Sequence, residues 1–243
     1  MDRGSAGGRS SVRRMDLERY LRPTEYLDFR HPALAAYANE AVAGATSDRE
    51  KAVRLFLRVR DDVRYSPYAI SLAPGGFAAS TTLENRVGFC VTKAILLAAT
   101  WRAVGIPARL GFADVINHLA TARLRELMGT DVFSFHGNAE AWLDGRWVKA
   151  TPAFNATLCE KFGTEPLEWD GVHDAILQPL NTGGARFMEY VRDRGTFDDF
   201  PLDAMLAAWR ELYPRFFEAN GAPAAPAPPT GDFEAEATKD RSR

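Results

Sequence analysis

A long apolar run between a cysteine and a Gly-Ile-Pro turn constrains the fold of this chain more than any other feature. From Val91 to Val104 the run contains neither proline nor glycine, and its apolar residues cover nearly every side of a helix. A helix that is apolar all round is a buried one. Gly105 and Pro107 end it. The sequence therefore predicts a central core helix with Cys90 at or next to its first turn.

The position of Cys90 is open to two interpretations. Unpaired backbone N–H groups and the helix dipole at a helix start favour an anion, so they lower the pKa of a cysteine and promote the nucleophilic thiolate. The alternative is that Cys90 is a buried apolar residue that begins a core helix. The second cysteine, Cys159, could pair with it, but two cysteines do not make a disulfide framework. We expect a reduced, cytoplasmic protein in which Cys90 is free.

Composition excludes several classes of protein. The 243 residues are 46% hydrophobic, which is enough for one domain with a real core. A net charge of −2 gives no reason to expect nucleic acid or an anionic membrane as a partner. No apolar stretch approaches the ~18 residues that span a bilayer. We expect one domain over residues 15–218, with a core at 62–155 and additional helices on either side. Residues 1–14 are expected to be a disordered leader, and 219–243 a disordered Ala/Pro-rich tail.

A strand and a hairpin follow the central helix. Every second residue from 134 lies on one face of a period-two pattern, which gives the set Ser134, His136, Asn138, Glu140 and Trp142. Asp144-Gly145 predicts a two-residue hairpin turn, and residues 146–151 a return strand. In this hairpin register, the residue numbers of each directly opposed pair add up to 289. Glu140 consequently faces Lys149, an opposite-charge pair that we interpret as structural.

The same register, which assumes no bulge, extends toward the histidine. Asn138 then faces Thr151, and His136 faces Ala153. Thr151 and Asn155 are diagonal neighbours of His136, at ~7–8 Å. A histidine beside a helix that begins with cysteine suits thiol catalysis, in which the imidazole takes the thiol proton, the thiolate attacks a carbonyl and a third polar group orients the base. Backbone N–H groups at the helix start could stabilise the oxyanion.

These motifs together resemble the transglutaminase-like superfamily. The matching residues are Gly88-Phe89-Cys90 with the helix that follows, Arg102-Ala103-Val104-Gly105-Ile106-Pro107-Ala108-Arg109, and His136 to Glu140 with Leu143-Asp144-Gly145-Arg146-Trp147-Val148. The resemblance covers roughly residues 65–155. It implies an α+β fold with a papain-like core, in which the helix that begins with cysteine packs on an antiparallel β-sheet. It also implies that Cys90 is the nucleophile and His136 the base.

The chain departs from the family pattern at the third catalytic residue. The family has an aspartate just before a proline on the return strand, whereas Thr151 precedes Pro152 here. A threonine hydroxyl can accept the imidazole N–H bond, but it cannot supply the negative charge that stabilises an imidazolium. Three alternatives follow: Thr151 orients His136, Asn155 does so as an amide does in papain-like proteases, or the site is impaired.

The predicted function is that of a cysteine-dependent hydrolase (protease or amidase) or acyltransferase, which acts on amide or peptide bonds through an acyl-thioester on Cys90. The alternative is a catalytically impaired module that binds a peptide or protein. Asn138, where the family usually has tryptophan, and Tyr68, in the turn-rich loop 62–78, are the candidate substrate-binding residues. No acidic calcium loop stands out, so we expect no metal and no cofactor. The expected partner is a peptide or protein substrate, with no nucleic acid and no membrane, and the residues do not specify an oligomeric state.

Overall fold

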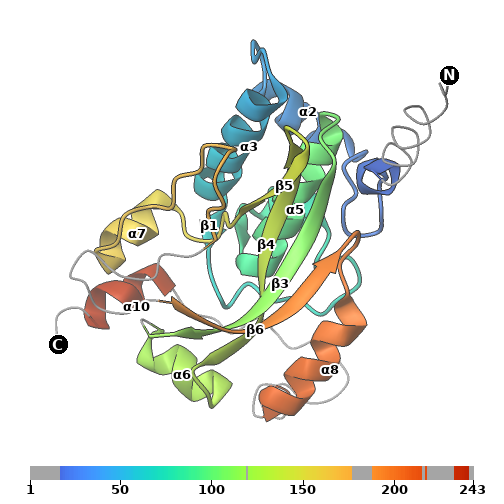
Figure 1. Cartoon of the computed structure of the whole chain (residues 1–243). Helices are drawn as coiled ribbons and strands as arrows, with labels where there is room; N and C mark the ends of the chain where they lie inside the picture. The colour runs from blue at the N-terminus through green and yellow to red at the C-terminus, as the bar shows by residue number, and fades with distance from the viewer. Residues whose placement is uncertain (1–16, 119, 177–187, 215–216, 218–232, 241–243) are drawn as a thin grey trace, which may run out of the picture.

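A four-stranded antiparallel sheet with helices around it forms the described part of the chain (Figure 1). The computed structural model describes residues 17–118, 120–176, 188–214, 217 and 233–240. The predicted leader, residues 1–14, lies outside these ranges. The elements in chain order are η1 (Arg19–Leu21), α2 (Pro32–Ala41), α3 (Asp48–Asp62), β1 (Arg64–Tyr65), α4 (Ala79–Asn85), β2 (Val87–Gly88), α5 (Cys90–Ala103), β3 (Ala108–Asn117), α6 (Ala122–Met128), β4 (Val132–Leu143), β5 (Arg146–Ala150), α7 (Ala156–Phe162), β6 (Met188–Phe197), α8 (Leu202–Leu212) and α10 (Phe233–Asp240). The predicted α+β class is confirmed.

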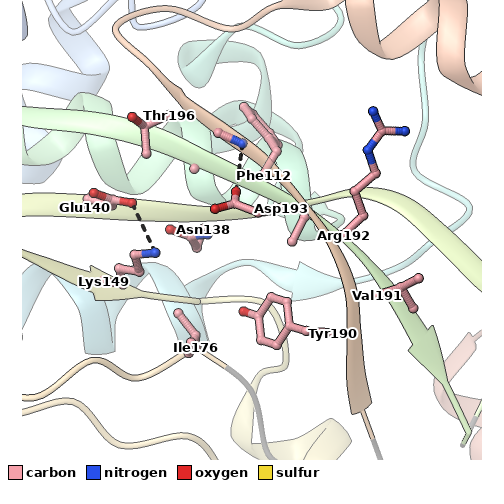
Figure 2. A pocket seen from close by; sticks show the side chains of 13 residues that line it. Phe112, Asn138, Glu140, Lys149, Ile176, Tyr190, Val191, Arg192, Asp193 and Thr196 are labelled. Atoms are coloured by element: carbon pink, nitrogen blue, oxygen red, sulfur yellow. Dashed lines mark hydrogen bonds and ion pairs between the residues drawn. The ribbon is translucent and has the colours of Figure 1, made fainter.

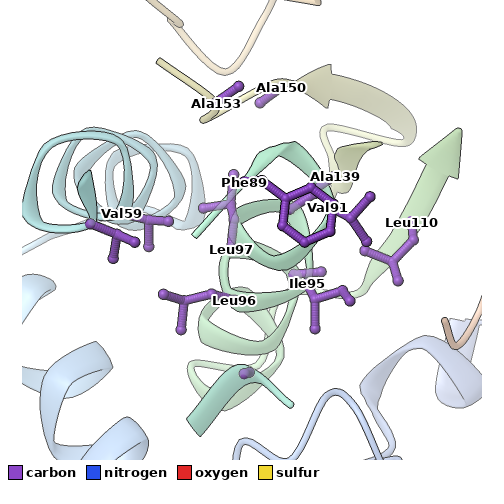
Figure 3. Close-up of a cluster of buried hydrophobic side chains, with 14 of the residues drawn as sticks. Val59, Phe89, Val91, Ile95, Leu96, Leu97, Leu110, Ala139, Ala150 and Ala153 are labelled. Carbon is purple, nitrogen blue, oxygen red and sulfur yellow. The ribbon is translucent and has the colours of Figure 1, made fainter. Parts of the chain in front are cut away.

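The predicted core helix is α5, and it is buried from Val91 to Arg102. Figure 3 shows its apolar side chains between α3, represented by Val59, and the sheet, represented by Leu110 and Ala139. Burial on all sides is what its mostly apolar composition predicts, since its few polar residues form no stripe that could face water.

Polar atoms of α5 attach this helix to its neighbours. The indole N–H of Trp101 donates to the carbonyl of Ala52 in α3 at 3.0 Å. The guanidinium of Arg102 donates to the carbonyl of Ala108 at 2.8 and 3.0 Å, which braces the Gly-Ile-Pro turn between helix and strand. The arginine in the sequence motif therefore has a structural role at the end of the helix.

The sheet has the order β5-β4-β3-β6. The predicted hairpin is confirmed, because β4 and β5 pair with Glu140 opposite Lys149 and with the predicted sum of 289 throughout. Asp144 and Gly145 have φ values of 49° and 84°. Left-handed conformations at both central residues match the type I′ turn that Asp-Gly favours. The pairing of β4 with β5 extends no further than Ala139 opposite Ala150.

Strand β6 and helix α10 are among the elements that the sequence analysis missed. Strand β6 adds to the free edge of β3, although its central residues are exposed and show no apolar alternation. Helix α10 lies within the segment predicted to be disordered, so that prediction is wrong for residues 233–240. Phe233 is buried there and packs on Tyr65, Tyr68 and Phe162. This buried aromatic residue, together with ion pairs and hydrogen bonds of Glu234 and Glu236, docks a segment whose composition is otherwise typical of disorder.

Helix α8 follows Pro201 and docks against β4 through Trp209 and Tyr213. None of the helices in the described ranges combines the length and apolarity that a bilayer crossing requires.

Candidate active site

Cys90 is the first residue of α5 and is partly exposed. The backbone N–H of Phe89 donates to the side-chain hydroxyl of Thr92 at 3.1 Å, which fixes the chain as it enters the helix. A Cβ atom at Gly88 would lie 2.6 Å from that hydroxyl, so glycine leaves the space that Thr92 occupies. The Gly-Phe-Cys motif therefore shapes the backbone that presents the thiol.

A small cavity brings Cys90 and His136 together. It has a volume of about 40 Å³, room for roughly one water molecule. Its walls come from residues 65–70 of the loop before α4, from α6, from β4 and from α8. Apart from the two reactive residues and Ser134, these walls are apolar or aromatic. A peptide cannot enter a cavity of this size unless the walls move.

Burial favours the neutral form of both reactive side chains near pH 7. Burial raises the pKa of the Cys90 thiol to about 11, although the backbone N–H groups of Gly137 and Val91 bond to the sulfur and act in the opposite direction. Burial lowers the pKa of His136 to about 4. Nε2 of His136 is buried and has no hydrogen-bond partner. The imidazole is thus in the form that can accept a proton, and burial of both groups disfavours a thiolate–imidazolium pair.

Thr151 is 4% exposed, and its hydroxyl oxygen is buried with no hydrogen-bond partner. Its backbone N–H donates to the carbonyl of Ala175 at 2.8 Å, so the chain turns away from β4 after Ala150. The register that would place Thr151 opposite Asn138 is therefore not part of the observed ladder. An unpartnered buried hydroxyl is still available to a nearby acceptor or donor.

Asn155 and Tyr68 do not line the cavity, and both have hydrogen-bond partners of their own. The side-chain oxygen of Asn155 accepts the backbone N–H of Tyr65 at 2.9 Å, and its amide nitrogen donates to Thr157 at 2.6 Å. The hydroxyl of Tyr68 donates to Glu236 of α10 at 2.6 Å. Asn155 thus anchors the start of the loop wall, and Tyr68 anchors the C-terminal helix.

Asn138 lies in a different cavity, on the face of the sheet away from α5. Figure 2 shows its amide among Glu140, Lys149 and Asp193. This second cavity has a volume of about 330 Å³, and neither Cys90 nor His136 lines it. The structure therefore brings together Cys90 and His136 of the candidate residues, and it places Asn138 elsewhere.

Two aromatic residues of α8 were not identified as part of the site. Trp209 and Tyr213 line the cavity, and the indole N–H of Trp209 donates to the carbonyl of Ser134 at 3.1 Å. The hydroxyl of Tyr213 accepts the N–H of Ser134 at 2.5 Å and donates to the carbonyl of Val132 at 3.0 Å. The helical spacing of these aromatics signalled a docking face, but no local pattern indicated which strand they would cover.

Metal ligation finds no support in the described ranges. Within them, no group of three or more His, Cys, Asp or Glu side chains is close enough to hold a metal ion. His173 pairs with Asp170 at 2.7 Å, but both side chains are exposed on a loop.

A cysteine at the start of a buried helix and a histidine on an antiparallel strand form the candidate active site of this α+β protein. Residues 35–152 match the family model of the transglutaminase-like superfamily. This core of the chain belongs to that superfamily.

Solved structures give partial matches. A candidate cysteine protease from Cytophaga hutchinsonii is 19% identical, with a TM-score of 0.47 over 76% of this chain and 47% of its own. The periplasmic domain of TgpA from Pseudomonas aeruginosa is 21% identical, with a TM-score of 0.40 over 61% of this chain and 48% of its own. The match therefore spans less than half the length of each. No curated protein matches the chain.

Proposed function

We propose that this chain cleaves amide or peptide bonds through an acyl-thioester on Cys90, with His136 as the general base. The single observation that supports this function is the shared cavity, in which the first residue of α5 meets a neutral histidine. Hydrolysis is favoured over amine transfer, since water is the small acceptor that a narrow apolar cavity admits.

The proposed reaction has two stages, acylation of Cys90 and hydrolysis of the thioester. The imidazole of His136 accepts the thiol proton while the sulfur attacks the carbonyl carbon of the substrate. The protonated imidazole then gives this proton to the leaving amine, and the C–N bond breaks to leave a thioester. Water, deprotonated by the same imidazole, attacks the thioester and releases the acid and the thiol. Backbone N–H groups at the start of α5 are suitable donors to the oxyanion.

Opening of the cavity is part of the proposal. Cys90 and His136 are held in their neutral forms by burial, and a closed cavity has no room for a peptide. A substrate that displaces the loop or α6 would bring a polar amide beside the thiol and favour proton transfer.

Alkylation tests the reactive pair. Iodoacetamide labelling of Cys90 is followed by mass spectrometry between pH 5 and 9, in wild type and in His136→Ala. We expect labelling near pH 7 to be at least about tenfold slower in the variant, in line with the contribution of a positioned base. Cys159, which is 1% exposed, reports unfolding as an internal control. Equal rates in both proteins would remove His136 from the mechanism.

A peptide-binding module without catalysis is the second candidate function. Thr151 favours it, because an uncharged hydroxyl cannot stabilise an imidazolium as the family's aspartate does. Incubation of the wild type and Cys90→Ala with a peptide mixture separates the two functions. An enzyme yields new peptide termini that disappear in Cys90→Ala, whereas a binding module retains intact peptides in both.

A further inference from the structure

Register shifts in the pairing of β3 with both of its neighbouring strands meet at one carboxylate. The pairing of β3 with β4 shifts by one residue between Ala113 and Val115, so two residues of β4, Ser134 and Phe135, lie opposite Asp114. This arrangement is a β-bulge, a feature that bends a strand and redirects its side chains next to functional sites. His136 is the residue that follows the bulge.

The strand on the other side of β3 carries a bulge as well. The pairing of β3 with β6 shifts between Phe112 and Ala113, and Arg194 is the extra residue of β6. Gly195, next along β6, has a φ of 90°, a left-handed conformation that suits glycine. Asp114 therefore lies between two bulged strands.

The carboxylate of Asp114 binds both bulges at once. Oδ1 accepts the hydroxyl of Ser134 at 2.8 Å and the backbone N–H of Phe135 at 3.1 Å. Arg194 donates from Nε at 2.9 Å to Oδ1 and from Nη2 at 2.7 Å to Oδ2. Burial acts to raise the pKa of Asp114, but the hydrogen bonds from Arg194, Ser134 and Phe135 outweigh it and hold the pKa below its usual value. Asp114 is therefore a charged carboxylate, only 5% exposed, that bonds to both bulged strands.

The backbone of Phe135 needs such bonds. Its φ of 59° lies in the left-handed region, which is strained for a bulky residue and persists only where the surroundings fix it. The bond from its N–H to Asp114 and the guanidinium of Arg194, 5.1 Å above its ring, both hold this conformation. His136 directly follows this bulge, begins the regular part of the β3–β4 ladder opposite Ala113, and lines the cavity of Cys90.

We propose that Asp114 and Arg194 are positioning residues that hold the Ser134–Phe135 bulge and thereby direct His136 to Cys90. The inference rests on the proposed function, in which His136 is the base. The buried Glu140–Arg109 ion pair, on the same two strands but away from the bulge, provides a matched control.

The experiment measures the His136 ring directly, so it does not depend on turnover. The chain has four histidines, and the ring resonances of 15N-labelled wild type are assigned with His136→Gln. The variants are Asp114→Ala, Asp114→Asn and Glu140→Gln. We expect the His136 resonances to shift or broaden in Asp114→Ala, to a smaller extent in Asp114→Asn, which keeps one acceptor oxygen, and to remain in place in Glu140→Gln.

Labelling of Cys90 near pH 7 gives the second readout. We expect Asp114→Ala to slow it at least about tenfold, as misplacement of a reacting group does, and Glu140→Gln to leave it unchanged. If Asp114→Ala fails to fold, Arg194→Gln is used in its place, and we expect the same slowing of Cys90 labelling. Unchanged His136 resonances in the Asp114 or Arg194 variants overturn the proposal, and so do equal changes in Glu140→Gln. If wild type and His136→Ala are labelled at the same rate, the proposed function fails. The His136 resonances alone then still decide whether Asp114 positions the ring.

Discussion

The ring of Phe233 packs against the ring of Tyr65, with centroids 5.7 Å apart and an angle of 61° between their planes. Tyr65 lines the cavity of Cys90, and Phe233 is buried at the start of α10. Glu236, one turn further along α10, accepts the hydroxyl of Tyr68. A helix near the end of the described chain therefore supports the loop that forms one wall of the candidate active site.

Phe233→Ala is expected to increase the rate of Cys90 labelling several-fold, because the wall at Tyr65 loses its support. The free energy of unfolding should fall by at most about 3 kcal/mol, the lower end for a buried Phe→Ala change, since α10 can detach without global unfolding. Labelling kinetics and urea denaturation measure the two effects. Cys159 must stay unlabelled for the comparison to hold. An unchanged Cys90 rate would mean that α10 does not control access.

Thr151→Asp restores the residue that the family has before the proline. A carboxylate close to His136 favours the imidazolium, so we expect the His136 pKa to rise from about 4 toward its ordinary value. Labelling of Cys90 at pH 6 to 7 should then accelerate by at least about tenfold. Thr151→Asn is the uncharged control, and NMR titration of the His136 ring is the measurement. If neither variant moves the titration, Thr151 does not contact the imidazole.

Local patterns predicted the centre of the fold correctly. A helix that is apolar on every side has one possible environment, and α5 occupies it. The Asp-Gly turn with an alternating strand fixed the β4–β5 register down to Glu140 opposite Lys149. The position of Cys90 at the start of α5 and that of His136 within β4 follow from these regular elements, and their catalytic roles stay predictions.

The bulge in β4 and the strand β6 depend on interactions between residues far apart in the chain, so local sequence patterns could not predict them. The bulge at Ser134 and Phe135 inserts one residue, so a strict period of two cannot give the direction of His136. Asp114, which bonds to this bulge, is itself held by Arg194, 80 residues away in the chain. The polar, exposed sequence of β6 gives no strand pattern, since one edge of β3 rather than an apolar face holds it in place.

Acid should destabilise the fold through His136. Burial lowers its pKa to about 4, against ~6.5 in an unfolded chain. Between these values the unfolded chain binds a proton that the folded chain does not, so stability falls as the pH drops from about 6.5 to about 4 and changes no further below that. The difference corresponds to roughly 3 kcal/mol.

Urea denaturation at pH 7 and pH 4.5 measures this contribution. We expect His136→Gln to lose roughly 2 to 3 kcal/mol less than wild type between the two pH values. His173→Gln removes an exposed histidine and should behave as wild type. The same loss in wild type and His136→Gln would show that the imidazole is hydrated or already charged in the folded protein.

Glu140→Gln tests the buried ion pair that supports the sheet. Glu140 is fully buried, and its Oε2 accepts Nε of Arg109 at 2.8 Å, while Nζ of Lys149 lies 3.8 Å from Oε1. Removal of one partner from a buried pair costs about 3–5 kcal/mol. We expect a smaller loss of about 2–3 kcal/mol, because glutamine keeps one acceptor oxygen and Arg109 remains stacked on Trp147 at 4.3 Å.

The matched variant is Lys149→Met, which removes the half-exposed partner. We expect it to cost less than about 1 kcal/mol, as exposed ion pairs do, so urea denaturation should rank the two substitutions clearly. A larger loss for Lys149→Met would assign the stabilisation to the 3.8 Å contact rather than to Arg109. Cys90 labelling should be the same in both variants and in wild type, because this pair acts on the strength of the β3–β4 pairing and not on the direction of His136.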